Sequence, residues 1–290
     1  MSWRVVVINS HCKLDLQMNN MVIRKGPDDV IAIYLSEIAV VVIENTGVSI
    51  TAALLAALIE RKIRVVFCDE KHNPISELHP YHGAHDANKK LRNQISWTLE
   101  SKSETWSLIA KEKIKNQSII LRMYGHIDVA ERLCQYANDV LDADITNREG
   151  HAARIYFNAL FGEEFYRDKD CYTNAALNYG YSIILSAINR EIVAAGYFTQ
   201  IGVFHNSVHN HFNFGCDLQE VFRPIVDRKV RSMELYGFGP KEKQEILSIV
   251  DESLMINGKS QTLFNAIGIY VRSVLDFINR DSNEIYFPVI

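Results

Sequence analysis

The amino-acid sequence predicts an α+β protein: a small N-terminal β-rich domain, residues 1–85, is followed by a larger all-α domain, residues 86–290. Two patterns support this. Short runs rich in valine and isoleucine, separated by turn-forming residues, fill the first part of the chain. From Asp86 onward, apolar residues recur instead at the three-to-four spacing of helices. With 290 residues, 48% of them hydrophobic and 23% charged, the chain is long and apolar enough to bury a core in each domain.

Six short runs of the first domain are predicted to be strands because they are rich in β-branched residues. They are Trp3–Asn9, Lys13–Asn19, Met21–Arg24, Val30–Leu35, Ile38–Ile43 and Arg64–Cys68. One helix interrupts them, and Ser49 or Thr51 could cap its start. Its residues up to Ile59 are apolar on nearly every side, so we expect it to be sandwiched against a sheet.

Three helices stand out in the second domain. The first begins near Thr173 and ends before Gly196, since glycine is typical of the position after a helix. The second opens at Pro240, a residue suited to a first turn, and its apolar face extends to Leu254. The third is expected from about Ser260 to Ile278.

Charge and cysteine content argue against a protein that coats nucleic acid by bulk positive charge and against a disulfide framework. The formal net charge is −4, so any binding to nucleic acid depends on local basic patches or on a partner. The five cysteines are far apart and odd in number, which is typical of reduced thiols in a cytoplasmic protein. The N-terminus lacks the pattern of a signal peptide, and the longest apolar run, Ile38–Ile43, is too short to span a bilayer. We therefore expect a cytoplasmic protein without a membrane partner.

Two motifs are chemically suggestive but weak. Gly258-Lys259-Ser260 resembles the end of a phosphate-binding loop, but Ser253 stands where that loop needs glycine and the preceding segment is predicted to be helical. His205, His209 and His211 form a cluster among asparagines, which favours a loop. Solvated histidines are the simpler interpretation for His209 and His211, whereas His205 is a candidate ligand.

Two carboxylate segments each allow a structural and a functional interpretation. Asp217 and Glu220 fit a capping box that opens a helix, but Pro224 should kink that helix close to both carboxylates and just after the histidine cluster. Asn147 is expected to cap another helix, with Glu149 in its first turn, where a carboxylate is favoured by the helix dipole. Spacing alone does not connect Glu149 with His205.

Basic residues gather in three places, and a solvated helix face is the default interpretation of each. The groups are Arg223, Arg228, Lys229, Arg231, Lys241 and Lys243; Lys89, Lys90 and Arg92; and Lys111, Lys113 and Lys115. The first group follows the carboxylates directly, and cations beside a carboxylate-rich centre suit a phosphodiester substrate. Arg223, Arg228, Lys229 and Arg231 are therefore the candidate DNA contacts.

Taken together, four motifs resemble a known family over essentially the whole chain. They are Trp3-Arg4-Val5-Val6-Val7, Asn147-Arg148-Glu149-Gly150-His151-Ala152-Ala153-Arg154-Ile155-Tyr156-Phe157, Leu177-Asn178-Tyr179-Gly180-Tyr181 and Asp217-Leu218-Gln219-Glu220-Val221-Phe222-Arg223-Pro224. The chain resembles the integrase subunit of CRISPR adaptation, the first-numbered CRISPR-associated protein, in its type II form. That family has an N-terminal β domain and a C-terminal helical domain.

The resemblance implies that Glu149, His205 and Glu220 are metal ligands and catalytic residues, with Asp217 a weaker acidic candidate. Two carboxylates and one imidazole suit Mg²⁺ or Mn²⁺. Such an ion would stabilise the charge that develops in an in-line displacement at phosphorus. The implied reaction is attack by the 3′-hydroxyl of a short DNA fragment on a phosphodiester at the end of a CRISPR repeat.

The resemblance also implies partners. They are prespacer DNA and the CRISPR array, a second copy joined through the β domains, and a small ferredoxin-like adaptation protein in a heterohexamer. Type II relatives also cooperate with a ring-shaped adaptation protein and the RNA-guided effector nuclease. Two alternatives stay open: a stand-alone metal-dependent nuclease acting on branched or other DNA, and a catalytically silent scaffold.

Overall fold

A computed structural model describes residues 4–70, 74–78, 80 and 86–290 of the chain. The chain divides into two compact units, residues 1–83 and 84–290. The domain boundary predicted near residue 85, and the start of the first predicted strand at Trp3, lie outside the described residues.

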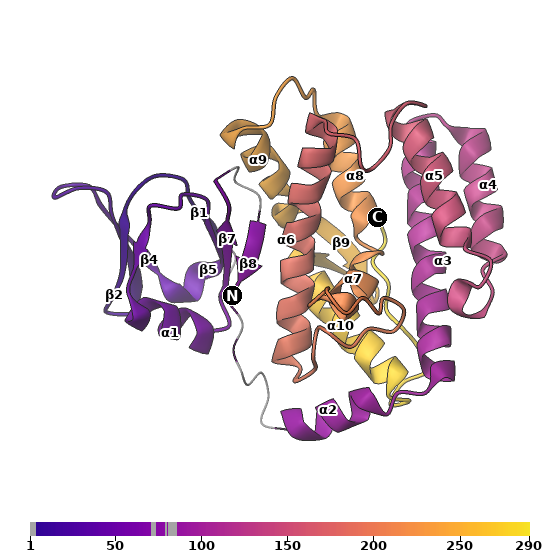
Figure 1. The fold of residues 1–290 in the computed structure, drawn as a ribbon, viewed down its shortest axis with the longest axis horizontal. Helices are drawn as coiled ribbons and strands as arrows, with labels where there is room; N and C mark the ends of the chain where they lie inside the picture. The colour runs from indigo at the N-terminus through magenta and orange to yellow at the C-terminus, as the bar shows by residue number, and fades with distance from the viewer. Residues whose placement is uncertain (1–3, 71–73, 79, 81–85) are drawn as a thin grey trace. The chain divides into compact units, whose positions relative to one another are not determined.

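The first unit consists of strands around one helix (Figure 1). Its elements are β1 (Arg4–Ile8), β2 (Lys13–Gln17), β3 (Asn20–Arg24), β4 (Val30–Tyr34), β5 (Ile38–Ile43), β6 (Ser49–Ile50), α1 (Ala52–Glu60), β7 (Arg64–Cys68) and β8 (Pro74–Glu77). One sheet has the order β1-β5-β7-β8, in which β1, β5 and β7 are parallel and β8 is antiparallel. The other has the order β4-β3-β2-β6. The six predicted strands are therefore all present.

The core of this unit follows from the apolar runs of its strands. All six residues of β5 are buried, as expected for a central strand covered on both faces. Thr51 caps α1 by accepting a hydrogen bond from the backbone N–H of Leu54 over 3.3 Å, which decides between the two predicted caps. Helix α1 packs against β2 and β7, as predicted, but it is buried on one face only: Leu54 and Leu58 are buried, whereas Ala53 and Ala56 are exposed. Alanine is a strong helix former without needing burial.

The second unit is mostly helical (Figure 1). Its helices are α2 (Ala87–Ile95), α3 (Leu99–Met123), α4 (Ile127–Asn138), α5 (Arg148–Phe161), α6 (Tyr172–Ala194), α7 (Asn213–Gln219), α8 (Arg223–Ser232), α9 (Pro240–Leu247) and α10 (Leu263–Ile278). Short 3₁₀ turns lie at Asp142–Asp144 and Ser248–Asp251, and the first unit has another at Leu35–Glu37. The predicted α+β class, with strands first and helices after, is confirmed.

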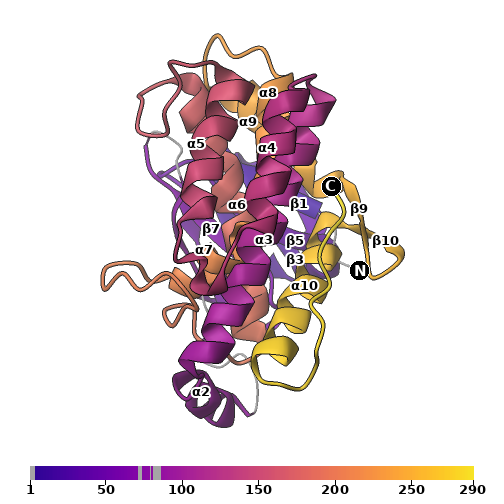
Figure 2. The same ribbon diagram turned by 90° about the vertical axis from the view of Figure 1, so that its right-hand side faces the viewer.

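The long helix α3 brings the rest of this unit together. It packs against α4 and α5, which lie beside it in both views (Figures 1 and 2), and it also contacts α7, α8 and α10. On the other side of the unit, α6 packs closely against α8. A Cβ added at Gly180 of α6 would lie 2.4 Å from Cγ1 of Val226, so this close crossing requires glycine.

Two sequence predictions for this unit need correction. A hairpin of β9 (Ser253–Ile256) and β10 (Lys259–Thr262) replaces the end of the second predicted helix and the start of the third, so the domain is not all helical. Asn257 and Gly258 have positive φ and form its two-residue turn, a strong hairpin signal that the periodic apolar residues around it obscured. The Gly258-Lys259-Ser260 motif therefore belongs to a hairpin.

The predicted kink at Pro224 is a complete break between two helices. Proline lies in the first turn of α8, where its missing N–H costs no hydrogen bond, and α7 has already ended at Gln219. No helix among the described residues is long and apolar enough to cross a membrane.

Candidate active site

The side chains of Glu149, Glu220 and His205 are positioned by three separate segments of the helical unit. Glu149 lies in the first turn of α5, Glu220 lies between α7 and α8, and His205 lies in the irregular segment before α7. Helix α3 contacts α5, α7 and α8, and it supplies a fourth side chain to the site.

The first turn of α5 is fixed by two side chains. Asn147 caps the helix as predicted, since its Oδ1 accepts a hydrogen bond from the N–H of Gly150 over 3.3 Å. The buried carboxylate of Asp144 accepts two more, from the N–H of Arg148 over 2.8 Å and of Glu149 over 2.9 Å. The backbone of Glu149 is therefore held in place by Asp144, and its side chain forms an ion pair with a residue of α3.

Glu220 is buried at the junction of α7 and α8. The predicted capping box is wrong, because Asp217 lies inside α7 instead of before a helix. The junction is attached to α3 by a buried hydrogen bond of 3.2 Å from Nδ2 of Asn116 to the carbonyl oxygen of Val221. A buried carboxylate away from helix capping needs a cation to be stable.

That cation is Lys113 of α3, whose ammonium group forms ion pairs with both Glu149 and Glu220. Its side chain is only 6% exposed, so the default interpretation of Lys113 as part of a solvated helix face was wrong. Burial by itself lowers the pKa of Lys113, but the carboxylates of Glu220 and Glu149 outweigh it and the pKa is raised. Lys113 is the site residue that sequence reasoning missed.

Arg223 is the second cation at Glu220. Its Nη2 lies 3.3 Å from Oε1 of Glu220, and its guanidinium lies over the ring of Tyr181, 4.9 Å from the ring centroid. Burial raises the pKa of Glu220, but Arg223 and Lys113 together outweigh burial and hold the pKa below its ordinary value. Glu220 is therefore ionised at neutral pH.

His205 is held by Asp217, which is fully buried. Oδ1 of Asp217 lies 2.6 Å from Nδ1 of His205 and also accepts the N–H of His205 over 2.9 Å. Oδ2 accepts the N–H groups of Val203 and Phe204 over 2.7 Å and 3.2 Å. With both oxygens occupied in this way, Asp217 positions the segment that carries His205, a role that the acidic motif alone does not reveal.

The orientation of His205 leaves its second ring nitrogen available. When Nδ1 donates to Asp217, Nε2 carries the lone pair that a metal ion requires, and the side chain is 40% exposed. The hydrogen bond to Asp217 raises the pKa of His205, although burial opposes it. The residue before His205 is also held in place. Phe204 stacks on the buried ring of Trp106, with 4.2 Å between the ring centroids, and this contact fixes the backbone next to His205.

The donor set is chemically suited to a hard divalent cation. Two carboxylates and an imidazole provide oxygen and nitrogen ligands, and the position between the carboxylates already holds a positive charge, the Lys113 ammonium. Within the described part of the chain, no three His, Cys, Asp or Glu side chains are arranged to hold a metal ion. Metal binding by Glu149, His205 and Glu220 would therefore require these side chains to rearrange around Lys113.

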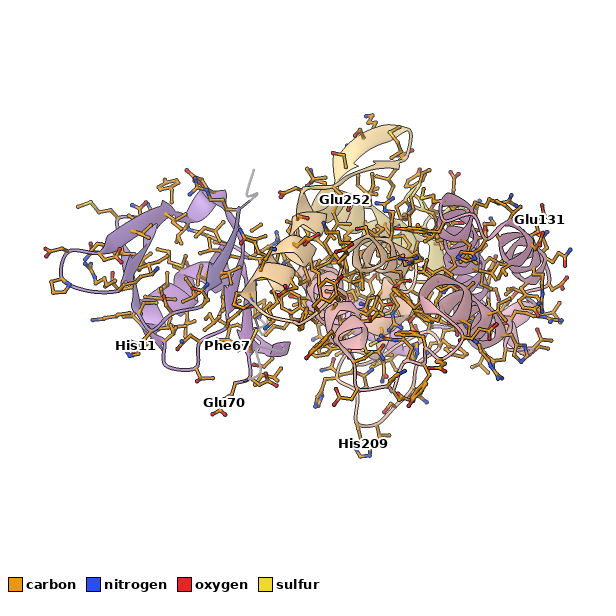
Figure 3. The ribbon with its side chains drawn as sticks, turned by 90° about the horizontal axis from the view of Figure 1, so that it is seen from above. His11, Phe67, Glu70, Glu131, His209 and Glu252 are labelled. Carbon is orange, nitrogen blue, oxygen red and sulfur yellow. The ribbon has the colours of Figure 1, made fainter. Side chains whose placement is uncertain are left out.

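The other sequence candidates are distributed more widely. His209 is exposed at the outer end of its loop (Figure 3), and His211 is exposed as well. Nη2 of Arg228 lies 2.5 Å from Oε2 of Glu252, which Figure 3 places on the opposite side of the helical unit from His209. Nζ of Lys229 lies 3.6 Å from Glu245.

Among the predicted DNA contacts, Arg223 adjoins the candidate ligands directly. Arg231 is exposed and its guanidinium lies over the ring of Tyr124, 5.2 Å from the centroid. Arg228 and Lys229 instead face acidic partners in the segments after α8. The basic group that looked continuous in sequence is thus divided between two places.

A further buried carboxylate, Asp227, lies in α8 and was not predicted. Asp227 of α8 accepts hydrogen bonds from the hydroxyls of Tyr156, over 3.1 Å, and of Tyr181. Burial raises the pKa of Asp227 to about 6, although both hydroxyls act in the opposite direction. Tyr181 also lies under the guanidinium of Arg223. Asp227 and its two tyrosines therefore hold α5, α6 and α8 together beside Glu220.

Comparison with known proteins gives one consistent result. Residues 5–235 match the family described as CRISPR associated protein Cas1. The CRISPR-associated endonuclease Cas1 of Neisseria meningitidis serogroup C (strain 8013) is 34% identical over 298 residues, which cover 100% of this chain and 97% of that protein. Among solved structures, a casposase bound to integration product has a TM-score of 0.79 at 18% identity, covering 98% of this chain and 92% of that chain. A chain of a Cas6-RT-Cas1–Cas2 complex has a TM-score of 0.73 at 16% identity, covering 97% of this chain and 35% of that chain. At these identities the two structures share the fold.

Proposed function

Because this chain belongs to the Cas1 family of CRISPR-associated proteins, as the sequence resemblance predicted, we propose that it is the metal-dependent DNA integrase of CRISPR adaptation. Its substrates are short DNA fragments with free 3′-hydroxyls, and its targets are phosphodiesters at the ends of a CRISPR repeat. The observation that carries this proposal is the convergence of Glu149 and Glu220 on one cation position, and the orientation of His205 by Asp217 is consistent with it. The integration product bound by the related casposase supports strand transfer over hydrolysis alone.

Glu149, Glu220 and Nε2 of His205 are the groups that would hold Mg²⁺ or Mn²⁺. When bound, the ion supplies Lewis-acid stabilisation of the charge that builds up on phosphoryl oxygens. Asp217 holds His205 in the tautomer with a free Nε2, and the capped first turn of α5 holds Glu149. Arg223, partly exposed beside Glu220, is placed to pair with a DNA phosphate.

The reaction exchanges one phosphodiester for another. The 3′-hydroxyl oxygen forms a bond to phosphorus as the bond from phosphorus to the leaving 3′-oxygen of the target strand breaks, and the hydroxyl proton passes to the leaving oxygen through solvent. The number of phosphodiester bonds is unchanged, so the step needs no nucleotide hydrolysis. This is consistent with the assignment of Gly258-Lys259-Ser260 to a hairpin.

The partners follow from the same proposal. They are a second copy of this chain bound through the β domain, and the small ferredoxin-like adaptation protein, in a heterohexamer. The Cas6-RT-Cas1–Cas2 complex, which contains a chain of this fold, supports the second partner. In such an assembly, the partner and local cations contact the DNA, which accounts for the net charge of −4.

A strand-transfer assay tests the proposal. Labelled short duplex DNA with free 3′-hydroxyls is mixed with a supercoiled plasmid bearing a CRISPR repeat and Mn²⁺, with and without the small partner. Joined product is expected, and it should disappear with blocked 3′ ends, with chelator, and in Glu149→Gln and Glu220→Gln, each reduced by about a thousandfold or more. His209→Ala, at the exposed end of the loop, is the matched control and should stay active.

The alternative is a nuclease that hydrolyses DNA without joining it. It is favoured by one observation, the name endonuclease carried by the relative in Neisseria meningitidis. Cleavage without joined product, even with the small partner present, would support this alternative and overturn the integrase proposal. Full joining by Glu149→Gln and Glu220→Gln would instead support a scaffold.

A further inference from the structure

Lys113 has a position that neither its neighbours in sequence nor the proposed chemistry requires. Lys113 and Lys115 both lie on α3, but the side chain of Lys115 is 56% exposed and that of Lys113 is 6% exposed. Its ammonium group contacts one oxygen of Glu149, in α5, and one of Glu220, in the junction between α7 and α8. Lys113 therefore occupies the place where their negative charges converge.

The formal charges in this cluster already balance. Lys113 and Arg223 contribute two positive charges, and Glu149 and Glu220 contribute two negative charges. A divalent cation added to this balanced group would lie beside an ammonium in a buried place, where like charges repel strongly. A metal ion that binds between the same two carboxylates takes the place that the ammonium group of Lys113 occupies.

We propose that Lys113 is the resident counter-ion of the Glu149–Glu220 pair and that a divalent ion displaces its ammonium group from them on binding. This inference rests on the proposed function, because it takes Glu149 and Glu220 as the metal ligands. Lys113 is thus a positioning residue that keeps two buried carboxylates together and weakens the binding of the metal ion. Removing its charge destabilises the metal-free protein and tightens the binding of Mn²⁺.

Direct measurement of Mn²⁺ binding tests the proposal without using activity. Calorimetric titration, or electron paramagnetic resonance of free Mn²⁺, is applied to the full chain and to Lys113→Met, which keeps the length of the side chain and removes its charge. We expect the dissociation constant for Mn²⁺ to fall by about tenfold or more in Lys113→Met. Lys115→Met, on the same helix but exposed, is the control and should bind Mn²⁺ as the unmodified chain does.

Thermal unfolding provides the second readout. Lys113→Met should melt at a lower temperature than the unmodified chain without metal, and Mn²⁺ should raise its melting temperature by more than it raises that of the unmodified chain. If Lys113→Met does not fold without metal, Lys113→Gln replaces it, because its amide still donates hydrogen bonds to a carboxylate. Unchanged or weaker Mn²⁺ binding in the folded variant would overturn the proposal.

The metal site and the counter-ion role of Lys113 can be overturned separately. If the unmodified chain binds Mn²⁺, and Glu149→Gln and Glu220→Gln abolish that binding, the metal site of the proposed function stands. Wild-type affinity in both Lys113 variants would then overturn the counter-ion role alone. If Mn²⁺ binding does not depend on Glu149 or Glu220, the metal site and the counter-ion role are both overturned.

Discussion

Nδ1 of His205 lies 2.6 Å from Oδ1 of Asp217, and the same oxygen accepts the backbone N–H of His205 over 2.9 Å. One buried carboxylate thus fixes both the backbone and the ring of the same histidine. Carboxylate partners of this kind set the tautomer and direction of metal-binding histidines in other proteins. Asp217, which the sequence offered as a weak ligand candidate, instead orients the candidate ligand His205.

Asp217→Asn should disturb the orientation of His205 without preventing the protein from folding. The amide cannot accept all four hydrogen bonds of the carboxylate, so we expect strand transfer to fall by about 10- to 100-fold while the variant still folds. The pKa of His205 should fall toward its ordinary value, because the hydrogen bond to Asp217 is the largest cause of its raised pKa. An NMR titration of the imidazole measures this pKa, and an unchanged value would contradict the assigned role.

Gly202 lies close to this carboxylate. A Cβ at position 202 would be 2.6 Å from Oδ2 of Asp217 and 2.6 Å from the carbonyl oxygen of His205. Gly202→Ala should therefore displace the His205 segment, destabilise the fold by about 1–3 kcal/mol and reduce joining. Gly237→Ala is the control because a Cβ there meets no atom within 4 Å. Equal melting temperatures and activities for both variants would show that the segment adapts at no cost.

Asp227 should make stability depend on pH. Its folded-state pKa, about 6, lies above its ordinary value of 3.8, so the folded protein holds this proton more tightly than the unfolded chain does. The stabilisation is fully present below the unfolded pKa and is lost as pH rises through about 6, with a magnitude of about 3 kcal/mol. The free energy of unfolding, measured with denaturant from pH 4 to pH 7, should therefore decrease as pH rises. Asp227→Asn should remove this decrease. Asp168→Asn, at an exposed position, should leave the pH profile unchanged.

Arg223 and Arg228 should differ in their contribution to DNA binding. Arg223 lies beside Glu220, whereas Arg228 is engaged by Glu252. Arg223→Gln should weaken binding of short duplex DNA and reduce the slope of log K against log salt concentration by about one, and Arg228→Gln should change it little. Fluorescence anisotropy in chelator at several salt concentrations measures both slopes. If the salt slope were reduced in Arg228→Gln alone, the DNA would bind on the side of Arg228 and Glu252 instead of beside Glu220.

Much of the chain could be interpreted from local sequence. Strand-forming runs, the Thr51 and Asn147 caps and the glycine after α6 depend on residues within a few positions of one another. Helix and strand propensities, capping and apolar periodicity act over this range, so they predicted the order of the two domains. The β9–β10 hairpin was missed because its apolar residues fitted a helical spacing, although Asn257-Gly258 signalled the turn.

The site itself depended on contacts between distant segments. Lys113 is 36 residues from Glu149, and the family resemblance alone connected Glu149 with His205 and Glu220. By itself the sequence determined which segments become helices and strands and which residue types are available for chemistry. The tertiary structure alone decided that Lys113 is buried between two carboxylates, that Asp217 holds His205, and that Asp227 meets two tyrosines. The reason is physical: the energy of a charge depends on its burial and on its neighbours in space, and local propensity carries no information about either.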